Sequence, residues 1–168
     1  LSRGLGDVYK RQGFKNLGSK FSHQKNWKKS IFETYQDASI DLKWTDQLKN
    51  KCDKVGIEFC STPYAFDLTD HLDKFVNFYK IGSGDITWID LLEYVSLKGK
   101  PVILSTGASD ILEVETAVKA IQKYNNEIVL MQCNTNYTAN DEENFNYINL
   151  NVLKKYQEKF PNTVLGLS

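Results

Sequence analysis

The sequence predicts an α/β fold in which parallel strands alternate with helices. From residue 40 onward, short apolar runs of strand length alternate with segments whose apolar residues repeat at helical spacing. This strand–helix unit recurs at least four times. Because two-residue hairpins cannot link parallel neighbours, such a repeat requires parallel strands joined by crossover helices.

Five apolar runs are the predicted strands, and three of them are rich in β-branched residues. They cover residues 56–62, 78–82, 101–106, 128–133 and 164–168.

Five segments between or beside these runs are the predicted helices. They cover residues 44–55, 68–75, 88–97, 111–124 and 145–160. In the fourth, five apolar residues approximate one helical face: Leu112, Val114, Val118, Ile121 and Tyr124. Asp110 precedes this segment and Glu113 follows three residues later, which is the spacing of a capping box. The alternation does not show whether the sheet closes, since an eight-stranded barrel and an open doubly wound sheet fit it equally well.

Composition limits the kinds of partner. The chain has 168 residues and 41% hydrophobic residues, which suits one globular domain with a core. Lysine plus arginine and aspartate plus glutamate both total 21, so no net charge attracts the chain to nucleic acid or an anionic membrane. Small molecules or proteins are the expected partners.

The three cysteines form no C-x-x-C pair, which predicts reduced thiols in a cytoplasmic protein. No apolar run approaches the roughly 20 residues that a membrane-spanning helix needs, and the N-terminus lacks the apolar region of a secretory signal.

Residues 1–12 show no helical or strand periodicity and resemble a translated sequencing-adaptor junction. We expect them to be a non-native extension, with a natural disordered arm as the alternative. The expected domain therefore covers residues 13–168.

Small polar residues follow four of the five predicted strands. These ends are Ser61 to Pro63, Gly82 to Asp85, Ser105 to Gly107, and Cys133 to Tyr137. Ligands bind at the carboxyl ends of parallel strands in both architectures, and repeated hydroxyl groups there indicate an anionic, phosphate-like ligand. The alternative for each hydroxyl is helix capping. Residues 82–84 match neither the dinucleotide G-x-G-x-x-G motif nor a Walker loop, so nucleotide binding is disfavoured.

Lys80 lies inside an apolar strand, where a buried ammonium needs an anion or a shifted pKa. The alternative is an outward lysine that snorkels past the helix layer. Lys100, just before Pro101, is predicted to be a solvated loop residue.

Other residue types give no functional assignment. His23 and His71 have no neighbours at metal-ligand spacing, so the chain offers no predicted metal site. The aromatic residues Phe145, Tyr147 and Tyr156 are predicted to be packing residues.

Four segments resemble the N-acetylneuraminate (sialic acid) synthase family, which includes legionaminic and pseudaminic acid synthases. They are residues 58–63 (Glu-Phe-Cys-Ser-Thr-Pro), 79–85 (Tyr-Lys-Ile-Gly-Ser-Gly-Asp), 99–107 (Gly-Lys-Pro-Val-Ile-Leu-Ser-Thr-Gly) and 166–168 (Gly-Leu-Ser). The resemblance runs from about Gly13 to Ser168. It implies a (β/α)8 barrel, of which about strands three to seven are present.

The resemblance also implies an activity, in which the enol carbon of phosphoenolpyruvate adds to the open-chain aldehyde of an N-acyl hexosamine. Water attacks and phosphate leaves, giving a nonulosonic acid for surface glycans. By family position, phosphoenolpyruvate would be held by Lys80, Thr62, Ser83, Ser105 and Ser168. Tyr137, Asn26 and Thr135 would lie at the sugar, and Asp85 would contact the sugar or shuttle a proton.

Departures from the family pattern limit this expectation. Thr138 follows Tyr137 where the family usually has proline, and Thr135 stands where serine or asparagine is common, so the sugar is left open. The family's first-strand glutamate, its second-strand lysine segment and its metal-binding histidines have no counterpart. We therefore expect an inactive fragment whose Mn or Mg ligands lie outside this chain. The resemblance implies that the complete enzyme is a homodimer.

Two other functions fit the same residues. One is a Schiff-base aldolase with Lys80 as the nucleophile. The other is a fragment without catalytic activity, or a phosphate-binding module.

Overall fold

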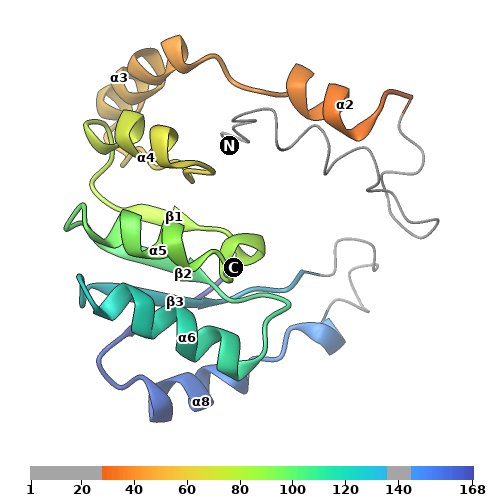
Figure 1. The fold of residues 1–168 in the computed structure, drawn as a ribbon, viewed down its shortest axis with the longest axis vertical. Coiled ribbons are helices and arrows are strands. Elements are labelled where there is room, and N and C mark those ends of the chain that lie inside the picture. Colours follow the sequence, from red (N-terminus) through yellow and green to blue (C-terminus); the bar gives the residue numbers. More distant parts are fainter. Residues whose placement is uncertain (1–27, 136–144) are drawn as a thin grey trace.

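Four parallel strands form the centre of the computed structural model, which describes residues 28–135 and 145–168 (Figure 1). The strands are β1 (Tyr79–Ile81), β2 (Val102–Ser105), β3 (Ile128–Gln132) and β4 (Val164–Leu167). Each lies within a run that the sequence predicts to be a strand.

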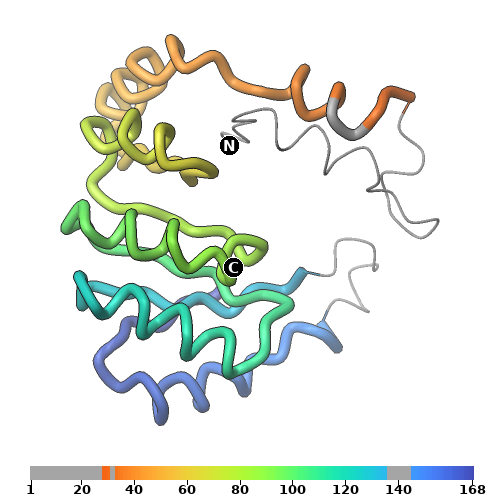
Figure 2. Tube along the Cα trace, viewed as in Figure 1, coloured from red at the N-terminus to blue at the C-terminus, as the bar shows by residue number. Residues whose placement is uncertain are grey.

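Helices precede and connect the strands. The elements before the sheet are α2 (Ile31–Asp37), the 3-10 helix η2 (Leu42–Trp44), α3 (Thr45–Val55) and α4 (Phe66–Asp73). The connecting elements are η3 (Ser83–Asp85, a 3-10 helix), α5 (Ile89–Ser96), α6 (Ile111–Gln122) and α8 (Val152–Lys159). Figure 2 shows α4, α5, α6 and α8 following one another in chain order along the long axis.

The sheet order decides between the two architectures that the alternation left open. The strands lie in the order β1-β2-β3-β4, and every pair is parallel. The connecting helices pack on one face, where their apolar side chains join those of the strands in a single core. A doubly wound sheet reverses its strand order and carries helices on both faces, whereas a (β/α)8 barrel has sequential strands inside one helical layer. The chain therefore has the fold of a barrel sector.

The two faces of this sheet differ in burial. Tyr79 and Ile81 are fully buried against the helices. Lys80 lies between them in β1, so its side chain points to the other face of the sheet. On that face Lys80 lies opposite Ile103 of β2, and Ile103 lies opposite Val129 of β3. These residues are only partly buried. The face that carries Lys80 corresponds to the inside of a barrel.

The prediction of a strand at residues 56–62 is wrong, since residues 57–63 form neither helix nor strand. Side chains hold this segment beside β1 instead: Asn77 Nδ2 donates to Glu58 Oε2 at 2.7 Å, and Cys60 Sγ lies 3.9 Å from the carbonyl of Phe78. A strand enclosed on both faces needs a continuous apolar run. Here Ile57 and Glu58 are exposed.

The predicted helix at 145–160 is interrupted in the structure: residues 145–147 are helical, but residues 148–151 are not, and α8 begins only at Val152. Asn149 has a φ of 45°, in the left-handed region that interrupts a right-handed helix. Asparagine tolerates this conformation better than most residues.

The other helix predictions agree with the structure to within two residues. At α6, Asp110 accepts hydrogen bonds from the backbone of Leu112 and Glu113, and the Glu113 carboxylate accepts from the Asp110 N–H. The predicted capping box is confirmed.

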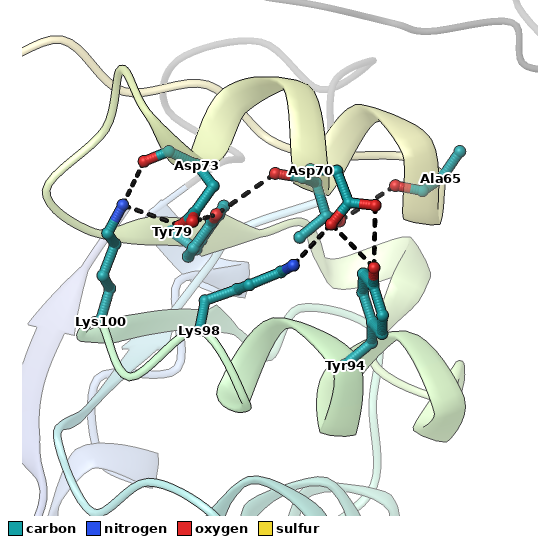
Figure 3. A network of polar contacts seen from close by, with 8 residues as sticks. Ala65, Asp70, Asp73, Tyr79, Tyr94, Lys98 and Lys100 are labelled. Atoms are coloured by element: carbon teal, nitrogen blue, oxygen red, sulfur yellow. Dashed lines mark hydrogen bonds and ion pairs between the residues drawn. The ribbon is translucent and has the colours of Figure 1, made fainter.

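A polar network joins α4 to the amino-terminal edge of the sheet (Figure 3). The Tyr79 hydroxyl donates to Asp73 Oδ1 at 2.8 Å, and the Lys100 ammonium lies 2.8 Å from the same oxygen. Lys100 is therefore not the solvated loop residue that the sequence predicts. Beside it, Asp70 pairs with Lys98 and accepts a hydrogen bond from Tyr94. Both clusters lie at the opposite edge from the strand ends where ligands bind in barrels.

None of the described helices is long and apolar enough to cross a membrane.

Candidate functional site

The carboxyl ends of the strands bring together residues that are far apart in the chain. Gly107, after β2, lies between Ser83, which follows β1, and two residues that follow β3. A Cβ atom built on Gly107 would lie 2.4 Å from Thr135 Cγ2, 3.0 Å from Ser83 Oγ and 3.1 Å from Cys133 Cβ. Its φ is not in the left-handed region, so close approach and not backbone conformation calls for glycine here.

The Ser83 hydroxyl acts as a hydrogen-bond acceptor toward Gly107. The Gly107 N–H donates to Ser83 Oγ at 3.0 Å. A serine hydroxyl has one proton and can accept through its lone pairs, so Ser83 keeps its own proton for a second bond. Ser83 can therefore donate to an anion.

Ser105, at the end of β2, is a buried hydroxyl that needs a partner. The residue is 3% exposed, and its Oγ has no hydrogen-bond partner among the described residues. Side chains alternate along a strand, so Ser105 shares a face with Ile103 and hence with Lys80. Since buried polar groups are nearly always hydrogen-bonded, an unpartnered hydroxyl on the same sheet face as a lysine indicates a ligand position.

Lys80 is half-buried in β1, and the Cys60 thiol lies close to it. Burial raises the pKa of Cys60, although the backbone N–H and the charge of Lys80 partly oppose this rise. A thiol with a raised pKa stays protonated and is a poor nucleophile. The charge available at this position is thus the lysine ammonium.

Asp85 lies close to the turn after β1. A Cβ atom built on Gly82 would lie 3.6 Å from Asp85 Oδ2 and 3.9 Å from the Tyr64 hydroxyl. The short helix η3 holds this turn, since the Asp85 N–H donates to the Gly82 carbonyl at 3.0 Å. The carboxylate is consequently near the strand end that follows Lys80.

The other predicted site residues that the structure describes are Ser168, Thr62 and Thr135. Ser168 continues the β3–β4 ladder: its N–H donates to the Gln132 carbonyl at 2.8 Å, and its side chain is exposed. Thr62 is half-buried in the segment beside β1, and Thr135 is exposed. Asn26 and Tyr137 lie outside the described residues, as do residues 1–12.

The pair Thr106 and Tyr156 was missed by sequence reasoning as part of the site. The Tyr156 hydroxyl of α8 donates to Thr106 Oγ1 at 2.9 Å, and both residues are 2% exposed. Fifty residues separate the two in the chain, so no local pattern could have indicated the bond. A cavity of about 520 Å³ lies beside them, lined among others by Gly107, Ser109, Gln132 and Asn134.

The comparison with known families agrees with this geometry. The sequence profile of the NeuB family matches residues 7–168. The chain belongs to the NeuB family. The family resemblance that the motifs indicate is therefore confirmed.

Relatives of this NeuB-family chain are longer proteins. It is 38% identical over 143 residues to the protein MJ1065 of Methanocaldococcus jannaschii, covering 84% of this chain and 41% of that one. It is 31% identical over 135 residues to the N,N'-diacetyllegionaminic acid synthase of Campylobacter jejuni, covering 78% and 39%. The chain thus spans about two fifths of the length of these curated relatives.

A solved structure supports the same assignment. The N-acetylneuraminic acid synthetase of Leptospira borgpetersenii, crystallised with citrate, superposes with a TM-score of 0.72 at 28% identity. The match covers 86% of this chain and 50% of that one.

Within residues 28–135 and 145–168, no group of three or more histidine, cysteine, aspartate or glutamate side chains has suitable geometry to hold a metal ion. The described residues do not fit a metal site, so no chemical step is assigned to one.

Proposed function

We propose that this chain supplies the phosphoenolpyruvate-binding part of a sialic acid synthase-type enzyme. The observation that carries the proposal is that Lys80 and Ser105 lie on the same face of the sheet and that the buried Ser105 hydroxyl lacks a partner among the described residues. Ser83 adds a hydroxyl whose proton remains available. An ammonium and two hydroxyl donors suit the carboxylate and phosphate of phosphoenolpyruvate.

The proposed reaction forms one carbon–carbon bond and one carbon–oxygen bond to water, and it breaks the carbon–oxygen bond to phosphate. The enol carbon of phosphoenolpyruvate attacks the aldehyde of an open-chain N-acyl hexosamine, and the aldehyde oxygen takes a proton and becomes a hydroxyl. Water adds to the former enol-ether carbon, and phosphate leaves to give the 2-keto acid. Lys80 would stabilise the anionic groups, and Asp85 would transfer a proton or hold the sugar.

The sugar contacts belong to the same proposal. Thr62 and Ser168 would complete the anion site, while Thr135, Tyr137 and Asn26 would face the sugar. The names of relatives, such as the legionaminic acid synthase, favour an N-acylated amino sugar as the acceptor. We further propose that the enzyme of full family length is a homodimer that binds Mn or Mg through residues outside this chain.

The test uses an enzyme of full family length that contains residues 28–168 unchanged. Phosphate release from phosphoenolpyruvate is measured with N-acetylmannosamine and with related N-acyl hexosamines. Lys80→Met keeps the apolar stem but removes the charge, so the protein should fold while kcat/KM falls at least ~100-fold, or about 2.7 kcal/mol. Lys98→Met, which removes a lysine at the opposite edge of the sheet, is the matched control and should leave kcat/KM unchanged.

Two results would contradict the proposal. A folded Lys80→Met enzyme with near-normal kcat/KM would show that Lys80 does not bind the substrate. Trapping of a covalent pyruvate adduct on Lys80 by borohydride would instead establish the Schiff-base aldolase.

A further inference from the structure

We infer that Tyr156 of α8 is a positioning residue, which acts through Thr106 to hold the Ser105 hydroxyl in the anion site. This inference rests on the proposed function, because it takes Ser105 to contact phosphoenolpyruvate. Separate experiments distinguish the role of Tyr156 from the role of Ser105.

A chain of hydrogen bonds links three elements at the end of β2. The Tyr156 hydroxyl donates to Thr106 Oγ1 at 2.9 Å, and Thr106 Oγ1 donates to the Met131 carbonyl of β3 at 3.0 Å. The Thr106 N–H donates to the same carbonyl, also at 3.0 Å. Thr106 is therefore fixed through both its backbone and its side chain.

The direction of these bonds is set by chemistry. Burial raises the pKa of Tyr156, so its phenol stays protonated and acts as a donor at neutral pH. Because Thr106 gives its only hydroxyl proton to Met131, its oxygen must accept from Tyr156. Both groups are nearly inaccessible to water, which therefore cannot replace a lost partner at low cost.

Ser105 and Thr106 are consecutive residues whose side chains point to opposite faces of the sheet. Ser105 faces the side of Lys80, whereas Thr106 faces the helices, so fixing one fixes the orientation of the other. The strand ends at Ser105, and residues 106–109 line the cavity of about 520 Å³. The bond from Tyr156 supports the segment where it leaves the sheet.

The experiment removes the phenol hydroxyl alone, with Tyr156→Phe in the enzyme of full family length. We expect KM for phosphoenolpyruvate to rise about fivefold, the factor that one neutral hydrogen bond contributes, while KM for the sugar stays unchanged. Thr106→Val should reproduce this rise, and Thr106→Ser, which keeps the hydroxyl, should restore normal KM.

A double-variant cycle tests whether Tyr156 acts through Ser105. Ser105→Ala alone should raise KM for phosphoenolpyruvate, and adding Tyr156→Phe to it should have no further effect. Tyr79→Phe is the control, since it removes another buried phenol hydroxyl at the amino-terminal edge. It should lower Tm and leave KM for phosphoenolpyruvate unchanged.

Two results would overturn the inference alone: Tyr156→Phe lowers Tm without changing KM, or its effect adds fully to that of Ser105→Ala. Either would make Tyr156 a purely structural residue while the anion site stands. If Ser105→Ala itself leaves KM for phosphoenolpyruvate unchanged, the anion-site assignment fails and the role of Tyr156 fails with it.

Discussion

Replacing Gly107 with alanine tests the geometry at the strand ends directly. The new methyl group would lie 2.4 Å from Thr135 Cγ2, far inside van der Waals contact, and 3.0 Å from Ser83 Oγ. Thr135 is exposed and can turn away, but the contacts with Ser83 and Cys133 remain tight. Overpacking of this kind costs ~1–3 kcal/mol. Alanine also lowers the conformational entropy of the unfolded chain relative to glycine, which stabilises the folded state by ~0.4–1 kcal/mol.

The net expectation for Gly107→Ala is a loss of about 1.5 kcal/mol of unfolding free energy, which for a chain of this size lowers Tm by about 3–6 °C. Thermal unfolding of the 168-residue chain, followed by circular dichroism, measures it. Thr135→Ser removes the nearest methyl group, so the double variant should recover part of the loss, with a coupling energy of ~0.5 kcal/mol or more.

Gly84→Ala is the matched control for this experiment. A Cβ atom at Gly84 meets nothing within 4 Å, and its φ is outside the left-handed region. This variant should be neutral or stabilised by up to ~1 kcal/mol. If Gly107→Ala behaves like Gly84→Ala, or if Thr135→Ser gives no recovery, the close approach at Gly107 is wrong.

Changes at three other positions, Asp73, Asp110 and Asn149, should also alter stability. Burial opposes ionisation of Asp73, but hydrogen bonds from Lys100 and Tyr79 outweigh it and hold the pKa of Asp73 below its ordinary value. Its contribution is therefore present above about pH 4 and lost as the pH falls below that value. Asp73→Asn should cost ~1 kcal/mol in urea unfolding at pH 7 and clearly less at pH 3, and an equal cost at both would refute the ionic role. Asp110→Ala should cost ~1 kcal/mol through loss of the cap on α6, and Asp110→Ser, measured in the same way, only a few tenths. Asn149→Gly should leave Tm unchanged or raised, whereas Asn149→Val should lower it, because a β-branched residue is strained at a φ of 45°.

Local patterns predicted those parts of the fold that depend on neighbouring residues. The capping box at Asp110 and the four observed strands follow from spacing within a few residues, and both are confirmed. The left-handed Asn149, which divides the predicted helix at 145–160, has no such pattern. Nothing near it in the sequence distinguishes it from an ordinary helical asparagine.

Contacts between distant residues explain the other errors. Lys100 looks solvated from its neighbours along the chain, but its ion-pair partner Asp73 lies 27 residues earlier. The carboxyl ends of the strands could be predicted as the ligand-binding edge, because the carboxyl ends of parallel strands all lie at the same edge of the sheet. The crowding at Gly107 and the bond from Tyr156 to Thr106 depend on how far each strand extends, which the sequence does not give.

The sequential order of the strands has a consequence for synthesis. Among the described strands, each pairs only with strands adjacent to it in the chain, so a newly made strand finds its partner in the segment just completed. Chains emerge from the ribosome amino terminus first, at about 5–20 residues per second, and contacts between neighbouring segments form faster than distant ones. The sheet can therefore grow one strand–helix unit at a time during translation, with each new helix covering apolar surface before the next unit appears.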